Sequence, residues 1–166
     1  MKTVMMMAIT ADGKIAKNDK HFPDWTSKED KKLFAKISKK HGVVMMGAKT
    51  FATFPAPLPG RLNVVFTLEK NPPKVEGVKW VTGEPEPVLK ELEAMGCKSA
   101  LLGGGAYLNT LFLKRGLIDE IILTVAPKIF GKGLSLFNED FDINLKLLGM
   151  EKINENTITL RYKVTY

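Results

Sequence analysis

The sequence contains few of the residues that form disulfides and metal sites. It contains one cysteine, Cys97, and two histidines, His21 and His41, among 166 residues. A single thiol excludes an internal disulfide and indicates a reducing compartment. Too few Cys and His are present for an ordinary zinc site. We therefore expect a cytoplasmic protein that holds no metal.

Long apolar runs, repeats and low-complexity segments are also missing. The apolar stretch over residues 1–9 is short and runs into Asp12 and Lys14, which predicts a buried strand rather than a signal peptide or a membrane span. A chain of this length can form its own core. We expect one domain over residues 1–166 and no membrane partner.

The charge is strongly one-sided, with 25 Lys and Arg against 18 Asp and Glu and a net charge of +7. Such a protein attracts anions of many kinds. The lysines are scattered along the chain rather than clustered, which disfavours a nucleic-acid surface. Small anionic molecules account for the charge, so we expect a small-molecule substrate and no nucleic-acid partner.

Short runs rich in Val, Ile, Leu and Met alternate with helical patterns, which is typical of buried strands in an α/β sheet. The expected strands are 3–9, 43–46, 62–67, 78–81, 99–102 and 120–126, followed by 146–153 and 158–166. The expected helices are 27–40, a short one opening at 47, 86–95 and 106–114. Apolar and polar residues alternate from Ile158 to Tyr166, the period of a strand with one wet face. The prediction is a three-layer α/β fold, with a mostly parallel sheet, helices on both faces and an antiparallel C-terminal edge.

The most informative residue is Asp30, in the first turn of the first expected helix. Thr26 and Glu29 have capping-box spacing, so Thr26 is the predicted N-cap. On a wheel of about 100° per residue, Asp30 lies within the apolar stripe that holds Phe34. A carboxylate facing a core is costly unless it is paired or functional. Two interpretations stay open: a first-turn acid favoured by the helix dipole, or a proton-handling acid at the floor of a pocket.

Two strand–glycine–helix turns favour a phosphate-bearing ligand. One is Gly47 before Ala48-Lys49-Thr50, and the other is Gly103-Gly104-Gly105 before Ala106. Glycine lets an anion approach backbone N–H groups at a helix start. One such turn is weak evidence, but two in a small α/β chain indicate a ligand with several phosphate charges, such as a dinucleotide.

These features together resemble the dihydrofolate reductase superfamily over nearly the whole chain. Trp25, Asp30 and Phe34 have the family's spacing around the pocket acid. The other matching motifs are Met46-Gly47-Ala48-Lys49-Thr50, Leu58-Pro59-Gly60-Arg61, Leu102-Gly103-Gly104-Gly105 and Leu123-Thr124. The resemblance implies reduction of dihydrofolate to tetrahydrofolate by hydride transfer from NADPH, a step of one-carbon metabolism.

The resemblance also implies a role for each matching residue. Asp30 would bind the pterin and support protonation, with Thr124 as its partner, while Trp25 would sit near the nicotinamide and a bound water. The remaining substrate contacts would come from Met6, Phe34 and Arg61, the last gripping a glutamate carboxylate. The cofactor contacts would come from Ala8, Ile15, Gly47, Lys49, Thr50, Thr67, Gly103, Gly104, Gly105 and Ala106.

The chain also departs from that family. Ala48 stands where the family has an arginine that contacts the 2′-phosphate, which leaves Lys49, Thr67 or Lys70 to replace the contact. The segments Ala11–Ala16, Gly116–Glu120 and Ala126–Gly133 instead resemble the riboflavin-pathway diaminopyrimidine reductases. Those enzymes share the fold and NADPH, reduce a ribose phosphate and commonly form dimers, so such a reductase and a homodimer are the alternative expectation. A nucleotide-binding or nucleic-acid-binding domain without enzymatic activity is the third.

Overall fold

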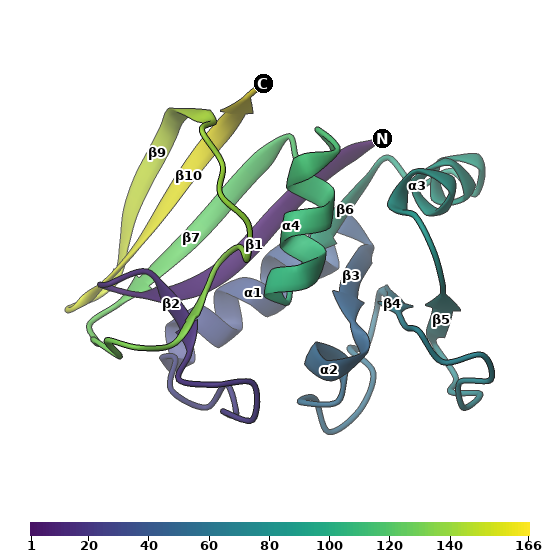
Figure 1. Cartoon of the computed structure of the whole chain (residues 1–166), viewed down its shortest axis with the longest axis horizontal. Coiled ribbons are helices and arrows are strands. Elements are labelled where there is room, and N and C mark those ends of the chain that lie inside the picture. The colour runs from purple at the N-terminus through teal and green to yellow at the C-terminus, as the bar shows by residue number, and fades with distance from the viewer.

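The computed structural model describes residues 1–166 as an α/β structure with one large sheet (Figure 1). The strands are β1 (Lys2–Thr10), β2 (Lys14–Ala16), β3 (Val43–Gly47), β4 (Leu62–Phe66), β5 (Val78–Val81), β6 (Ser99–Leu102), β7 (Glu120–Ala126), β8 (Leu134–Ser135), β9 (Asn144–Asn154) and β10 (Thr157–Thr165). The helices are α1 (Lys28–His41), α2 (Ala48–Phe51), α3 (Pro85–Ala94) and α4 (Ala106–Lys114).

The eight-stranded sheet has the order β5-β4-β3-β6-β1-β7-β10-β9. The first six strands of this order, from β5 through β4, β3, β6 and β1 to β7, pair in parallel. Strand β10 pairs antiparallel with both β7 and β9. This arrangement confirms the predicted mostly parallel sheet with an antiparallel C-terminal edge. All the parallel strands therefore point their carboxyl ends at one edge of the sheet.

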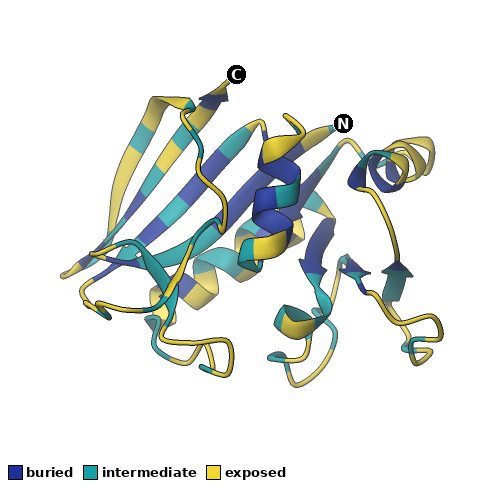
Figure 2. Ribbon diagram, viewed as in Figure 1, coloured by how far each residue is buried: buried dark blue, intermediate teal, exposed yellow.

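The central strand β1 is buried on both faces because helices cover both (Figure 2). Met5 packs on one face in the cluster that holds Phe112 of α4 and Leu92 of α3. Val4 and Met6 pack on the other face, against Leu33, Phe34 and Ile37 of α1. Such two-sided burial explains why this strand reads as an unbroken apolar run in the sequence.

The predicted cap of the first helix is wrong by one residue. Ser27, not Thr26, is the N-cap, and its hydroxyl accepts a hydrogen bond from the Asp30 N–H at 3.1 Å. Ser27 is extended, with φ −70° and ψ 163°, as an N-cap requires. The shift makes Asp30 the third helical residue. It also leaves the Thr26 side chain free to face the cleft that the next subsection describes.

The sequence did not predict two features of the fold. Strands β2 and β8 form a small antiparallel sheet of their own. The carboxylate of Asp12 accepts hydrogen bonds from the Phe130 and Gly131 N–H groups at 3.2 and 2.7 Å. These bonds join the loop after β1 to the segment after β7, so the motifs that resemble the riboflavin-pathway reductases have a structural task here.

The C-terminal hairpin follows the prediction in its two strands and their turn but not fully in burial. The turn at Glu155 and Asn156 joins β9 to β10, as expected. Thr157 and Thr159 are buried, however, while the alternating Ile158 and Leu160 are only partly so. Thr159 lies opposite Thr124 of β7, so its position on the sheet, rather than its polarity, decides its burial. None of the helices has the length and apolar character that crossing a membrane demands.

Candidate active site

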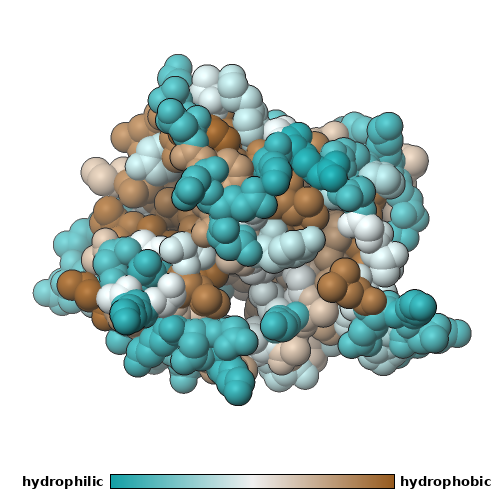
Figure 3. Space-filling model, in the orientation of Figure 1, coloured by the Kyte–Doolittle hydropathy of each residue, from teal (hydrophilic) through white to brown (hydrophobic).

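A long cleft of about 1380 Å³ opens at the carboxyl ends of the parallel strands. The turns that follow β3, β6 and β4 line its floor, and the loop around β2 lines one side. In the space-filling view, the lower edge of the molecule is notched between the region of β2 and that of α2 (Figure 3). Ligands of open α/β sheets bind at this edge, because the loops there are free to vary while the strands hold them in place.

Asp30 lies at one end of the cleft and is only 7% exposed. Burial raises the pKa of its carboxyl group, while the Thr124 and Thr26 hydroxyls and the positive charge of Lys31 oppose that rise. The Thr124 hydroxyl is itself buried and makes no hydrogen bond of good geometry within the chain. A carboxyl group in these surroundings holds a proton at a higher pH than an exposed aspartate does. This is the behaviour that a proton donor at the floor of a pocket needs.

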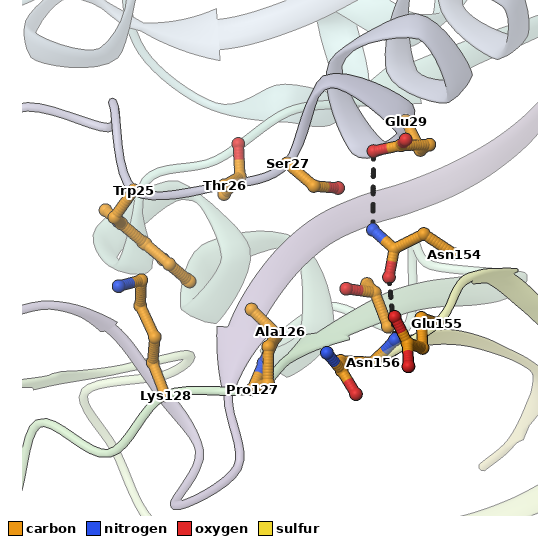
Figure 4. A pocket seen from close by; sticks show the side chains of 11 residues that line it. Trp25, Thr26, Ser27, Glu29, Ala126, Pro127, Lys128, Asn154, Glu155 and Asn156 are labelled. Atoms are coloured by element: carbon orange, nitrogen blue, oxygen red, sulfur yellow. Dashed lines mark hydrogen bonds between the residues drawn. The ribbon is translucent and has the colours of Figure 1, made fainter.

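Trp25 and Thr26 separate this end of the cleft from a smaller polar cavity of about 390 Å³ (Figure 4). The far wall of that cavity comes from the end of β7 and the β9–β10 turn, where the Asn154 side chain donates to Glu29 at 3.3 Å. The Trp25 ring packs edge-to-face on Phe130, with centroids 5.2 Å apart, and its buried N–H has no partner in the chain. Trp25 is therefore fixed by packing and presents an unsatisfied donor.

An apolar wall adjoins Asp30 in the cleft, beginning with Phe34 one turn further along α1. Phe34 and Phe54 lie nearly parallel, with ring centroids 6.4 Å apart, and both line the cleft. The edge of the Phe34 ring lies against Gly103, where a Cβ would come within 3.5 Å of it. Such a wall suits a flat aromatic ligand that stacks or packs edge-on.

The two glycine turns meet in the middle of the cleft. The Gly47 N–H donates to the Gly104 carbonyl at 2.9 Å, and the Gly103 N–H donates to the Met45 carbonyl at 2.8 Å. Gly104 has a φ of +91°, which disfavours any other residue, and a Cβ on Gly105 would lie 3.4 Å from the Thr50 hydroxyl. Glycine thus keeps open a narrow space between the start of α2 and the start of α4. It lies between two helix starts, where free backbone N–H groups can hold the phosphates of a ligand, and Thr50 is beside it.

The structure brings most of the predicted site residues to this one cleft. Those lining it are Met6, Ala8, Ile15, Trp25, Asp30, Phe34, Gly47, Lys49, Thr50, Thr67, Gly103, Gly105 and Ala106. Gly104 and Thr124 lie just behind this lining, where they contact Met7 and Asp30 respectively.

Arg61 lies outside the cleft lining. Its guanidinium donates to the Ala35 carbonyl at 3.2 Å, to the Pro59 carbonyl at 3.0 Å and to the Ser38 hydroxyl. These bonds hold the Leu58–Arg61 turn against α1. A substrate carboxylate would have to reach the guanidinium edge that these bonds leave free.

Three charged or polar residues of the cleft were not among the predicted site residues. Thr26 faces Asp30, Lys31 supplies a positive charge at the same end, and Glu69 lines the opposite end. Polar residues in loops and first helical turns are common at any surface. Only the assembled fold shows which of them face the ligand space.

Comparisons with known proteins show which proteins this chain resembles. A family model described as the RibD C-terminal domain matches residues 2–159. The chain is 28% identical to the uncharacterised protein YwjB of Bacillus subtilis over 97% of each chain. It is 30% identical to a Caenorhabditis elegans protein provisionally named as a dihydrofolate reductase, over 94% of this chain and 88% of that one.

Solved structures from both branches share the fold. The RibD structure of Acinetobacter baumannii matches with a TM-score of 0.84 at 21% identity, covering 99% of this chain and 58% of that one. Dihydrofolate reductase from Enterococcus faecalis, solved with NADP(H), matches with a TM-score of 0.75 at 19% identity, covering 99% and 97%. At these identities the likeness extends to the fold alone.

Proposed function

The chain belongs to the RibD C-terminal domain family, a family of reductase type, and we propose that it reduces dihydrofolate with hydride from a reduced nicotinamide dinucleotide. The observation that carries the proposal is Asp30. It is a buried carboxyl group with a raised pKa, at one end of a cleft whose middle is lined by the two glycine turns. The resemblance to dihydrofolate reductases predicts NADPH, and the similar Enterococcus faecalis enzyme was solved with NADP(H).

The proposed mechanism divides the work between the two ends of the cleft. The dinucleotide, when bound, supplies the hydride. Asp30 holds a proton at its carboxyl group and hydrogen-bonds the pterin, and the Thr124 and Thr26 hydroxyls lie beside that carboxyl group. Phe34 and Phe54 pack against the flat part of the substrate, and Trp25 limits the access of water. The gain in rate comes from orientation and a prepared proton donor.

A second candidate substrate is the diaminopyrimidine ribose phosphate of the riboflavin pathway. It is favoured by the position of Arg61, which bonds to α1 and stays outside the cleft lining. Without Arg61, the glutamate tail of a folate has Lys31 as its nearby positive charge. Lys31 would serve the phosphate of the smaller substrate equally well.

The deciding experiment measures oxidation of the reduced dinucleotide by absorbance, with each substrate in turn. We expect turnover with dihydrofolate and a loss of about 100-fold or more in Asp30→Asn, the range for removal of a general acid. Asp140→Asn is the matched control, because it makes the same chemical change at an exposed residue away from the cleft. Turnover with the ribose phosphate alone would move the assignment to the riboflavin branch. Turnover that Asp30→Asn leaves intact would contradict the role of the acid.

A further inference from the structure

The end of the cleft opposite Asp30 lies where the adenosine of a bound dinucleotide would reach. Asp30 and Ala8 mark the reacting end beside β1, and the glycine turns follow β6 and β3. The next loop along the edge, after β4, carries Thr67 and Glu69. From β1 to β4 the sheet order makes three steps, roughly 14 Å at the usual strand spacing. An extended dinucleotide with its nicotinamide beside Asp30 and its diphosphate between the turns places its adenosine ribose at this loop.

This ribose end has no arginine. The chain contains three arginines, and none of them lines the cleft. Arg61 is bonded to α1, Arg161 is bonded to Glu120, and Arg115 is bonded to Glu84 and Glu86. A 2′-phosphate is a dianionic group that is best recognised by the planar fork of an arginine. An arginine would be best placed at the start of α2 or in the loop after β4. These two positions are occupied by Ala48 and by Leu68, whose side chain is 95% exposed.

The same end carries acid instead. Glu69 lines the cleft directly after Leu68, and its N–H donates to the Thr67 hydroxyl at 3.0 Å, which fixes the course of the loop. Thr67 is in turn tied to β5, because its N–H donates to the Val81 carbonyl at 2.9 Å. Glu84 also lines this end, but Arg115 neutralises it. Lys49 is the one cation in the lining here, and it is exposed.

We infer that this end of the cleft takes an adenosine ribose with a free 2′-hydroxyl, so that NADH is preferred over NADPH, and that Glu69 decides the preference. The carboxylate of Glu69 accepts hydrogen bonds from the vicinal ribose hydroxyls and repels a 2′-phosphate, the arrangement that NAD-binding α/β proteins use at the carboxyl end of a strand. This inference rests on the proposed function, since it requires that the cleft bind a nicotinamide dinucleotide. It departs from the NADPH expectation that the overall resemblance gave.

The test is the dissociation constant of each reduced dinucleotide, measured by calorimetry without substrate. We expect the wild type to bind NADH at least tenfold more tightly than NADPH. Glu69→Gln should reduce that ratio at least fivefold, and Ala48→Arg should raise the affinity for NADPH while leaving that for NADH nearly unchanged. Glu76→Gln is the matched control, since it removes the same charge from an exposed residue outside the cleft.

Each remaining outcome counts against the inference in a recognisable way. NADPH binding as tightly as NADH, or more tightly, would overturn it and leave the proposed reductase standing. An equal change of ratio in Glu69→Gln and Glu76→Gln would show an effect of net charge and would overturn the assignment of Glu69. Binding of neither dinucleotide would overturn the inference together with the proposed function.

Discussion

The two ends of the cleft are built differently. At the reacting end, Asp30 is fixed by the first turn of α1 and enclosed by β1, β7 and the Trp25 loop, and it is almost fully buried. At the other end, Leu68 and Glu69 stand in an exposed loop that Thr67 anchors at its start. A buried site tolerates few changes, because each one disturbs packing or leaves a charge without solvent. An exposed loop can change its charge at little cost to stability, so cofactor choice can vary there while the chemistry stays the same.

The largest expected effect tests the reacting end through pH. The folded-state pKa of Asp30 is raised above its ordinary value of 3.8, so the protonated acid persists to a higher pH. If the protonated form is the active one, kcat/KM falls tenfold for each pH unit above the raised pKa. A profile of kcat/KM against pH checks this. A flat profile in the wild type would contradict it.

The same shift predicts the sign of an effect on stability. A raised pKa means that the folded state binds the Asp30 proton more tightly than the unfolded state does. The stability from this group is therefore fully present below pH 3.8 and is lost as the pH rises through the folded-state pKa. Asp30→Asn should accordingly unfold at no lower urea concentration than the wild type at pH 7. A marked loss of stability would show that the charged carboxylate has a structural partner.

The next effect tests the narrow middle that joins the two ends. Gly105 has a φ of −80°, which any residue can adopt, but its Cβ would lie 3.4 Å from the Thr50 hydroxyl. We expect Gly105→Val to weaken binding of either dinucleotide by at least tenfold, because the added methyl groups occupy the space between the turns. Calorimetric titration measures the loss. Gly149→Val is the control, since a Cβ at Gly149 of β9 meets no atom within 4 Å. Unchanged affinity in Gly105→Val would show that the diphosphate does not bind between the two turns.

A smaller effect concerns Arg61, beside the reacting end. Arg61→Ala removes the hydrogen bonds to α1 and should be less stable by about 1.5–3 kcal/mol, the usual range for a hydrogen bond that involves a charged group. Urea unfolding measures that change. If Arg61 also contacts a folate carboxylate, the KM for dihydrofolate rises in Arg61→Ala while the KM for a dihydropterin without the glutamate stays constant. An equal rise for both substrates would restrict Arg61 to a structural role.

The smallest effect lies away from both ends. Glu120 of β7 accepts hydrogen bonds from Lys2 and from Arg161, the latter at 2.8 Å. Burial works against the charge, but these two partners lower the pKa of Glu120 overall. Its stability contribution is present above the unfolded pKa and is lost as the pH falls through the folded value. Glu120→Gln should cost about 1 kcal/mol or less in urea unfolding at pH 7 and should leave both dinucleotide affinities unchanged. A change in dinucleotide affinity would show that Glu120 influences the cleft, contrary to this prediction.

The sequence by itself determined the layers of the fold and the position of the acid. The unbroken apolar runs of β1, β3 and β6 can be satisfied only by burial on both faces, and the wheel of α1 places Asp30 among apolar residues whatever lies opposite. The two glycine turns could also be predicted, because glycine interrupts the apolar run where each strand is followed by a helix.

Only the tertiary structure decided what those residues face. Ser27 replaces Thr26 as the cap because the backbone at Ser27 is extended and its hydroxyl reaches the Asp30 N–H. Arg61 turns to α1 through bonds to residues far away in the chain, and Glu69 lines a cleft that segments far apart in the chain enclose. Local patterns record propensity and burial. The direction of an exposed polar side chain depends on which distant strands pair, so it becomes known only when the sheet order is known.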